Sequence, residues 1–400
     1  MAYTVLARRY RSQSFADVVG QQHIAQTLRN AIAAGRVHHA YLFTGTRGVG
    51  KTSMARILAR ALNAPDTLED CPAPPDHDQY PQLDVQQRMA DGIMRGDDLN
   101  VIEIDGASNR GVEDARQLIA NASLSPTDNA RYKVYIIDEV HMLTKDAFNT
   151  LLKTMEEPPG HLKFILCTTE PEKVLPTIQS RCQRFDFRNI PTRQIADHLH
   201  SVIDRESVEA DPRVVFDLAR MANGSMRDGL SLLDRILAVG QSPLTAELVE
   251  QMLGLPDRQV LMQLTAAVVD RDVASTLAAA NELLNRGVSQ DQLIATLIDH
   301  LRELMIVGAC GAETDLVELD EQTKHELLQQ ASRFDTPALV HGIALLENVQ
   351  RWSRGSATPR AMLDAALARL ALAEQFGAAA ALAANARALA GATPTSVKKK

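Results

Sequence analysis

An eight-residue stretch at 45–52, Gly-Thr-Arg-Gly-Val-Gly-Lys-Thr, constrains the fold of this chain more than any other feature. It fits the pattern G-x-x-x-x-G-K-[ST], follows the apolar run 40–43 and precedes a helical pattern over 53–62, flanks that disfavour a chance glycine-rich turn. Glycines let backbone N–H groups curl around phosphates, and the start of the helix adds positive potential. We expect Lys51 to reach the β- and γ-phosphates and Thr52 to ligate Mg²⁺. The candidate ligands are Gly45, Thr46, Arg47, Gly48, Val49, Gly50, Lys51, Thr52 and Ser53.

Residues 1–188 alternate between short apolar runs and helical patterns, which is typical of a parallel sheet covered by helices. The apolar runs, each followed by a polar cluster, are 40–43, 101–104, 134–137 and 164–167. Ligands of open α/β sheets bind at the carboxyl ends of the strands. We therefore expect an α/β fold with functional residues where these runs end.

Two carboxylates follow the third apolar run. Asp138 is expected to hold Mg²⁺, and Glu139 is expected to polarise an attacking water, so both fit one ATP hydrolysis reaction with the phosphate-binding loop. The alternative is that they cap a helix beginning near Met142.

Three further side chains are candidates for the same reaction. Thr168 and Thr169 end the fourth run, where a threonine could sense the γ-phosphate, although such pairs are common in strands. Arg181 lies at the edge of the domain and suits charge stabilisation of a phosphoryl-transfer transition state, with a solvated surface arginine as the equal alternative. Arg227 opens a later helix and could fold back on the nucleotide, or be a surface charge beside Asp228.

The length of 400 residues and a hydrophobic content of 45% predict two or three domains. Beyond residue 188 apolar residues recur at helical spacing, and turn signals near Gly240 and Pro256 divide this helical part. The alanine-rich end finishes in three lysines and reads as a frayed helix or linker. The predicted parts are a nucleotide domain at 1–188, a small helical domain at 189–245, a second helical domain at 246–376 and a tail at 377–400.

The net charge, the cysteines and the apolar segments of the chain limit the surroundings in which it is expected to act. The net charge of −8 argues against a protein coated in positive charge, although a local basic stripe could still contact DNA. The four scattered cysteines favour the reduced cytosol, and the absence of an apolar leader or a run of about 20 apolar residues predicts a soluble, unsecreted protein.

Several segments together carry a family resemblance. They are 6–21, 45–52, 102–116, 135–143, 151–171, 180–185 and 224–234, and the likeness extends over about residues 1–370. The chain resembles the gamma/tau subunits of bacterial DNA polymerase III, which belong to the AAA+ clamp loaders. The resemblance implies a RecA-like nucleotide domain, a helical lid and a helical collar through which subunits form a five-membered spiral.

The resemblance also implies a function. ATP binding closes the spiral so that it opens the ring-shaped sliding clamp and grips primed DNA, and hydrolysis releases the clamp. The implied partners are delta and delta-prime subunits in a hetero-pentamer, the clamp, primer-template DNA and, if the chain extends beyond Lys400, the polymerase core. The implied location is the bacterial cytoplasm, at the nucleoid.

Residue roles follow from the same motifs. The resemblance assigns Lys51 and Thr52 to phosphates and Mg²⁺, Asp138 and Glu139 to the Walker B motif, Thr169 to a sensor, Arg181 to a finger acting on a neighbouring subunit, and Arg227 to the lid sensor. It also assigns Tyr10, Arg11, Val18 and Val19 to adenine packing, and Arg110 to a DNA-backbone contact that a solvated turn arginine would resemble.

The chain departs from this family in one segment. Family members usually carry a four-cysteine zinc module after the phosphate-loop helix, whereas 63–100 offers only Cys71, with His77 six positions on. A structural zinc site normally needs four ligands, so we expect no zinc, and the prolines predict an irregular loop.

Two other functions share these nucleotide-binding motifs. A branch-migration motor of recombination would be expected to carry a winged DNA-binding domain after the lid, whereas this region has helical periodicity. A non-hydrolysing structural subunit of the clamp loader is disfavoured by the intact phosphate-binding loop and carboxylate pair.

Overall fold

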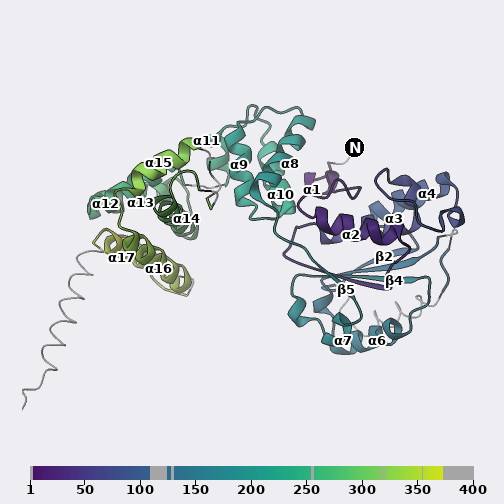
Figure 1. Cartoon of the computed structure of the whole chain (residues 1–400). Coiled ribbons are helices and arrows are strands. Elements are labelled where there is room, and N and C mark those ends of the chain that lie inside the picture. Colours follow the sequence, from purple (N-terminus) through teal and green to yellow (C-terminus); the bar gives the residue numbers. More distant parts are fainter. Residues whose placement is uncertain are drawn as a thin grey trace, which may run out of the picture. The chain divides into compact units, whose positions relative to one another are not determined.

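The computed structural model describes residues 3–108, 124–127, 130–253, 256–314, 316–317, 319, 321–353 and 355–372. The chain divides into two compact units, Met1–Leu244 and Thr245–Lys400, which are described separately (Figure 1). In the described part of the chain no helix is both long and apolar enough to cross a membrane.

A five-stranded sheet forms the centre of the first unit. Its strands are β1 (Ala40–Thr44), β2 (Val101–Asp105), β3 (Lys133–Asp138), β4 (Leu162–Thr168) and β5 (Gln183–Asp186). They lie in the order β2-β3-β4-β1-β5, and every neighbouring pair is parallel. The predicted α/β sheet is therefore confirmed, and the carboxyl ends of all five strands share one edge.

Helices cover both faces of this sheet because the central strands are apolar on both sides (Figure 1). On one face α2 (Gln22–Ala33) and α3 (Lys51–Asn63) pack against Phe43, Ile136 and Ile165. On the other face α6 (Lys145–Glu156) and α7 (Pro176–Gln179) pack against Leu42, Tyr135 and Phe164.

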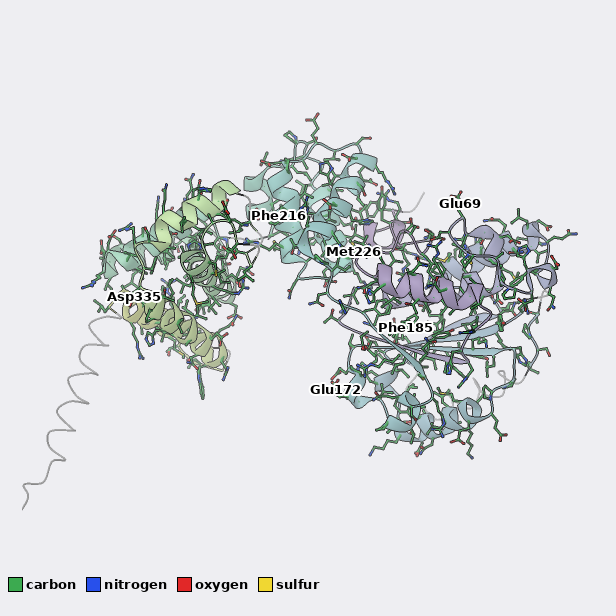
Figure 2. The ribbon with its side chains drawn as sticks, viewed as in Figure 1. Glu69, Glu172, Phe185, Phe216, Met226 and Asp335 are labelled. Atoms are coloured by element: carbon green, nitrogen blue, oxygen red, sulfur yellow. The ribbon has the colours of Figure 1, made fainter. Side chains whose placement is uncertain are left out.

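Strand β5 was not predicted. It has four residues that alternate between half-buried and exposed, so it lacks the continuous apolar run of the central strands. Phe185 holds it to the sheet by packing on Tyr41 and Phe43 of β1 (Figure 2).

The prediction of an irregular loop at 63–100 was wrong for the second half of that segment. Only its first half is irregular, with short turns η1 (Pro65–Thr67) and η2 (His77–Gln79). Residues Leu83–Arg95 form a regular helix, α4, which buries Met89 and Ile93 and ends at Gly96 in the left-handed conformation. The helix forms because apolar residues recur at helical spacing after the last proline.

Three helices follow the sheet within the first unit. They are α8 (Thr192–Arg205), α9 (Pro212–Met221) and α10 (Met226–Leu237), which bury Leu199, Leu218 and Leu233. Helix α10 begins at Met226 (Figure 2), after Ser225 caps it by accepting a hydrogen bond from the backbone N–H of Asp228. The described residues of this unit also include two shorter turns, η3 (Val140–Met142) and η4 (Pro171–Lys173), and the N-terminal helix α1 (Leu6–Arg9).

The described residues of the second unit form helices joined by loops, with no strand among them. Its helices are α11 (Ala246–Leu253), α12 (Arg258–Val269), α13 (Val273–Asn285), α14 (Gln290–Cys310), α15 (Glu321–Ala331), α16 (Thr336–Ser353) and α17 (Pro359–Ala371). Leucines along α14, including Leu297 and Leu304, pack into one apolar core with Leu346 and Leu367. The alanine-rich tail at 377–400 lies outside the described residues.

Candidate nucleotide-binding site

A cleft of about 1090 Å³ opens at the carboxyl edge of the sheet. Its walls come from the phosphate-binding loop, the N-terminal segment, the ends of β2 and β3, and the start of α10. The predicted site residues that line it are Tyr10, Arg11, Val18, Val19, Arg47, Gly48, Val49, Gly50, Lys51, Thr52, Ser53, Asp138, Glu139 and Arg227. Segments that are far apart in sequence therefore meet around one cavity.

The phosphate-binding loop is tightly curled. Gly48 and Gly50 have φ angles of 79° and 101°, which side chains other than glycine rarely adopt. The buried Lys51 ammonium donates hydrogen bonds to the carbonyls of Gly45 at 2.7 Å and Thr46 at 2.8 Å, and burial lowers its pKa. Phosphate oxygens would be stronger partners for this cation, because both groups would be charged.

The two predicted metal ligands are in direct contact. The Thr52 hydroxyl donates to Asp138 Oδ2 at 2.6 Å, and the backbone N–H of Glu139 donates to Asp138 Oδ1 at 2.9 Å. One hydroxyl and one carboxylate fit Mg²⁺, which usually takes its remaining ligands from water and substrate phosphates.

Glu139 is held in an unusual conformation. Its backbone is left-handed, with a φ of 46°. Its Oε2 accepts hydrogen bonds from the Thr169 hydroxyl at 3.0 Å and from the Thr169 backbone N–H at 3.3 Å. Thr169 does not line the cleft itself, so it reaches the site through Glu139.

His141 joins this arrangement and was not predicted. Its Nδ1 lies 3.0 Å from Thr168 Oγ1 and 3.5 Å from Glu139 Oε2, and its Nε2 lies 3.2 Å from Glu170 Oε1. In the sequence, its position two residues after Glu139 was the signal that could have identified it as a site residue.

The start of α10 lies against the phosphate-binding loop. The backbone N–H of Arg227 donates to the Gly48 carbonyl at 3.4 Å, and the Thr46 hydroxyl donates to Asn189 Oδ1 at 2.6 Å. A Cβ added to Gly48 would lie 1.9 Å from Ser225 Oγ. Glycine at 48 is therefore required by this close approach as well as by its φ angle.

The N-terminal segment is bound to α10 and to the end of α8. The Tyr3 hydroxyl donates to Asp234 Oδ1 at 2.5 Å. Glu206 forms an ion pair with Arg9 and accepts a hydrogen bond from the Tyr10 hydroxyl. These partners are about 200 residues apart along the chain, and no local pattern predicts them.

Arg11 lies among charged groups of the cleft. Its pKa is lowered by burial first, and then by the nearby cations Arg56 and Arg227. Arg56, which was not predicted, lines the cleft and donates to Glu103 Oε2 at 2.7 Å. This cationic wall suits a polyanionic ligand.

Comparisons with known proteins identify the family. Family models of the DNA polymerase III delta subunit, the clamp loader subunit ATPase lid domain, and the gamma and tau domain III match residues 20–191, 194–242 and 244–383. DNA polymerase III subunit gamma of Buchnera aphidicola is 38% identical over 301 residues, which are 75% of this chain and 80% of that protein. The chain belongs to the gamma/tau family of DNA polymerase III subunits. It therefore has the AAA+ fold with a helical lid, and that fold implies nucleotide binding.

Other gamma/tau relatives are longer. The tau subunit of Salmonella typhimurium is 41% identical over 322 residues, 80% of this chain and 48% of that protein. The tau subunit of Bacillus subtilis is 38% identical over 373 residues, 92% of this chain and 63% of that protein. The chain thus spans about half to two thirds of their length. A solved Holliday junction branch migration motor of Thermotoga maritima, with 17% identity, covers 80% of this chain and 90% of its own, but its TM-score of 0.46 supports no inference.

In this member of the gamma/tau family Arg181 lies away from the cleft. Its Nη2 forms an ion pair with Glu156 at 2.7 Å, and its Nη1 donates to the Thr177 carbonyl at 2.7 Å. About a third of its side chain, 33%, is exposed. Arg181 therefore does not line its own chain's cleft, and its role stays a prediction. Arg110 lies outside the described residues.

The segment around Cys71 is held by charged and aromatic contacts. Asp66 Oδ1 lies 2.5 Å from His77 Nε2, and Arg131 forms an ion pair with Asp76 while its guanidinium lies 4.7 Å from the Tyr80 ring centroid. Burial raises the pKa of the Cys71 thiol to about 12. Within the described residues, no group of three or more His, Cys, Asp and Glu side chains could hold a metal ion.

Proposed function

We propose that this chain is an ATP-hydrolysing motor subunit of the DNA polymerase III clamp loader, which opens a sliding clamp and loads it onto primed DNA. The observation that carries the proposal is the single cleft in which the Lys51 ammonium, the Asp138–Glu139 pair and the lid residue Arg227 meet. Membership of the gamma/tau family supports the clamp-loader setting, and it favours this function over branch migration.

Each side chain of the cleft has a proposed task. Lys51 binds the β- and γ-phosphates, and Arg227 binds phosphate from the lid. Thr52 and Asp138 would hold Mg²⁺, which neutralises phosphate charge when bound. Glu139 accepts a proton from the attacking water and is oriented by Thr169. The contacts of Thr52 with Asp138, and of Thr169 with Glu139, support these pairings.

The base would bind at the apolar part of the cleft. Val18, Val19, Ile190 and Leu230 line it there together with the Tyr10 ring. Ile190 and Leu230 come from the region of the lid, so base binding would depend on lid position. We propose that the charged surroundings of Arg11 direct its guanidinium towards phosphate rather than adenine.

Further proposals concern organisation and partners. We propose a nucleotide domain at 1–188, a lid at 189–245 and a collar at 246–376. The proposed partners are delta and delta-prime subunits, the sliding clamp and primer-template DNA, in the cytoplasm near the nucleoid. Arg181 is proposed to act on the ATP of a neighbouring subunit, and its distance from its own cleft supports that role.

The deciding experiment changes this arginine. Arg181→Ala should leave ATP affinity of the isolated chain within about twofold of wild type, while DNA-stimulated hydrolysis by the complex assembled with its sister subunits falls by about 10³-fold. Arg184→Ala is the matched control, because Arg184 is similarly exposed and pairs with Asp186 at 2.7 Å on neighbouring β5. Weaker ATP binding by the isolated Arg181→Ala chain, or full activity of the complex, would show a local structural role instead.

A further inference from the structure

We infer that His141 is a positioning residue for Glu139: its imidazole anchors the turn after β3 to the end of β4 and thereby fixes the direction of the glutamate carboxylate. The inference rests on the proposed ATP hydrolysis and adds a residue to its machinery.

The imidazole is fixed at both nitrogens. Its side chain is only 5% exposed and lies between Thr168 Oγ1, at 3.0 Å, and Glu170 Oε1, at 3.2 Å. An ionised carboxylate can only accept, so Nε2 donates to Glu170. Nδ1 is the ring nitrogen that forms the hydrogen bond with the Thr168 hydroxyl. The ring therefore has one orientation.

The outer partner is itself anchored. Glu170 Oε2 lies 2.6 Å from Lys173 Nζ, and this hydrogen bond, together with the charge of Lys173, lowers the pKa of the Glu170 carboxyl. Glu170 therefore stays ionised near neutral pH. The backbone N–H of Glu170 also donates to Thr168 Oγ1 at 3.0 Å, which closes the network on β4.

Glu139 needs such an anchor because its backbone is strained. A left-handed conformation is strained for a residue with a side chain, and it persists only where the surroundings hold it. The backbone N–H of Met142 donates to the Glu139 carbonyl at 2.9 Å, so the turn that carries His141 closes directly on Glu139. Attachment of His141 to β4 thus prevents the turn from relaxing.

The carboxylate is restricted from the same side. Thr169 donates twice to Glu139 Oε2, and Nδ1 of His141 lies 3.5 Å from that oxygen. The buried imidazole fills the space on this side of the carboxylate. Glu139 Oε1 is then the oxygen that can face the cleft and a water molecule.

The test measures turnover and ATP affinity separately in the assembled complex. His141→Ala should lower DNA-stimulated hydrolysis by about 10- to 100-fold, since a misplacement of about 1 Å has effects of that order, while Kd for ATP changes less than twofold. His141→Asn keeps a group near Thr168 and should recover part of the loss. His200→Ala is the control, because His200 is an exposed histidine of α8.

A double variant tests whether His141 acts through Glu139. In a Glu139→Asp background, which keeps a shortened carboxylate and therefore some turnover, His141→Ala should cause no further loss, whereas independent residues would give additive losses. Glu170→Ala, at a more exposed position, should slow turnover in the same direction and covers the case in which His141→Ala does not fold. Additive losses, or normal turnover of both His141→Ala and Glu170→Ala, would overturn the inference. Normal turnover of Glu139→Gln alone would instead refute the proposed function.

Discussion

Replacing Gly48 by alanine tests whether contact between lid and phosphate loop is part of nucleotide binding. Gly48 has a φ of 79°, and an added Cβ would lie 1.9 Å from Ser225 Oγ, 3.1 Å from Ser225 Cβ and 3.2 Å from Arg227 Cβ. Alanine is therefore strained in the backbone and overlaps the residue that caps α10. The free chain can relieve the strain by relaxing the loop and the overlap by releasing the lid, but the bound state needs the curled loop and the docked lid together.

The size of the effect follows from these two contributions. The left-handed backbone costs alanine about 1–2 kcal/mol. Turning the Ser225 hydroxyl away loses a helix cap worth about 1 kcal/mol. Their sum of about 2–3 kcal/mol corresponds to a loss of roughly 30- to 150-fold in affinity, at 1.4 kcal/mol for each factor of ten.

The assay is titration of the isolated chain with a fluorescent ATP analogue. Ser225→Ala alone removes the cap without an overlap and should raise Kd by about fivefold at most. Gly48→Ala with Ser225→Ala removes the overlapping oxygen, so the double variant should bind no more weakly than Gly48→Ala. A Gly48→Ala chain within twofold of wild type, or losses that simply add, would refute the reasoning.

Four other predictions follow from the same unit. Lys51→Ala should abolish ATP binding measured by calorimetry, because the buried cation is lost from the phosphate site. Glu139→Gln should keep ATP affinity and stop turnover, since Asp138 still holds the metal; parallel loss of both would contradict separate roles. Metal analysis should find well below one zinc per chain, whereas stoichiometric zinc bound through Cys71 would disprove that expectation. Hydrogen bonds from Tyr10 and Arg9 lower the pKa of the Glu206 carboxyl, so its stabilising contribution is present above pH 4.5 and lost as pH falls through the lowered pKa; the difference in Tm between wild type and Glu206→Gln should shrink over that range.

The central fold was predictable because its signals are local. Each of β1 to β4 is an apolar run followed by polar residues, and the phosphate-binding loop joins β1 to α3 within eight positions. Strand β5 gave no such signal, since an edge strand with one half-exposed face needs few apolar residues. Tertiary contacts of Phe185 hold this strand to the sheet, and a local sequence pattern cannot predict such contacts.

The residues of the candidate site also differ in how far a local sequence pattern predicts them. Asp138 and Glu139 follow directly from the strand that carries them. His141, by contrast, is one polar residue in a short turn, and its importance depends on Thr168 and Glu170 at the end of another strand. Sequence spacing does not reveal which side chains meet there until the strand order is known.

The attachment of the N-terminus to α10 has a consequence for synthesis. Tyr3 and Asp234 are 231 positions apart, so the first described residue of the chain binds a partner that the ribosome adds much later. The sheet can pair once Asp186 has emerged, because all its strands are then available. The partners of Tyr3, Arg9 and Tyr10 in the N-terminal wall of the cleft, however, exist only once α8 and α10 have followed. Nascent chains that carry the complete sheet but stop before Asp234 should therefore hold nucleotide weakly, and ATP capture would begin only late in translation.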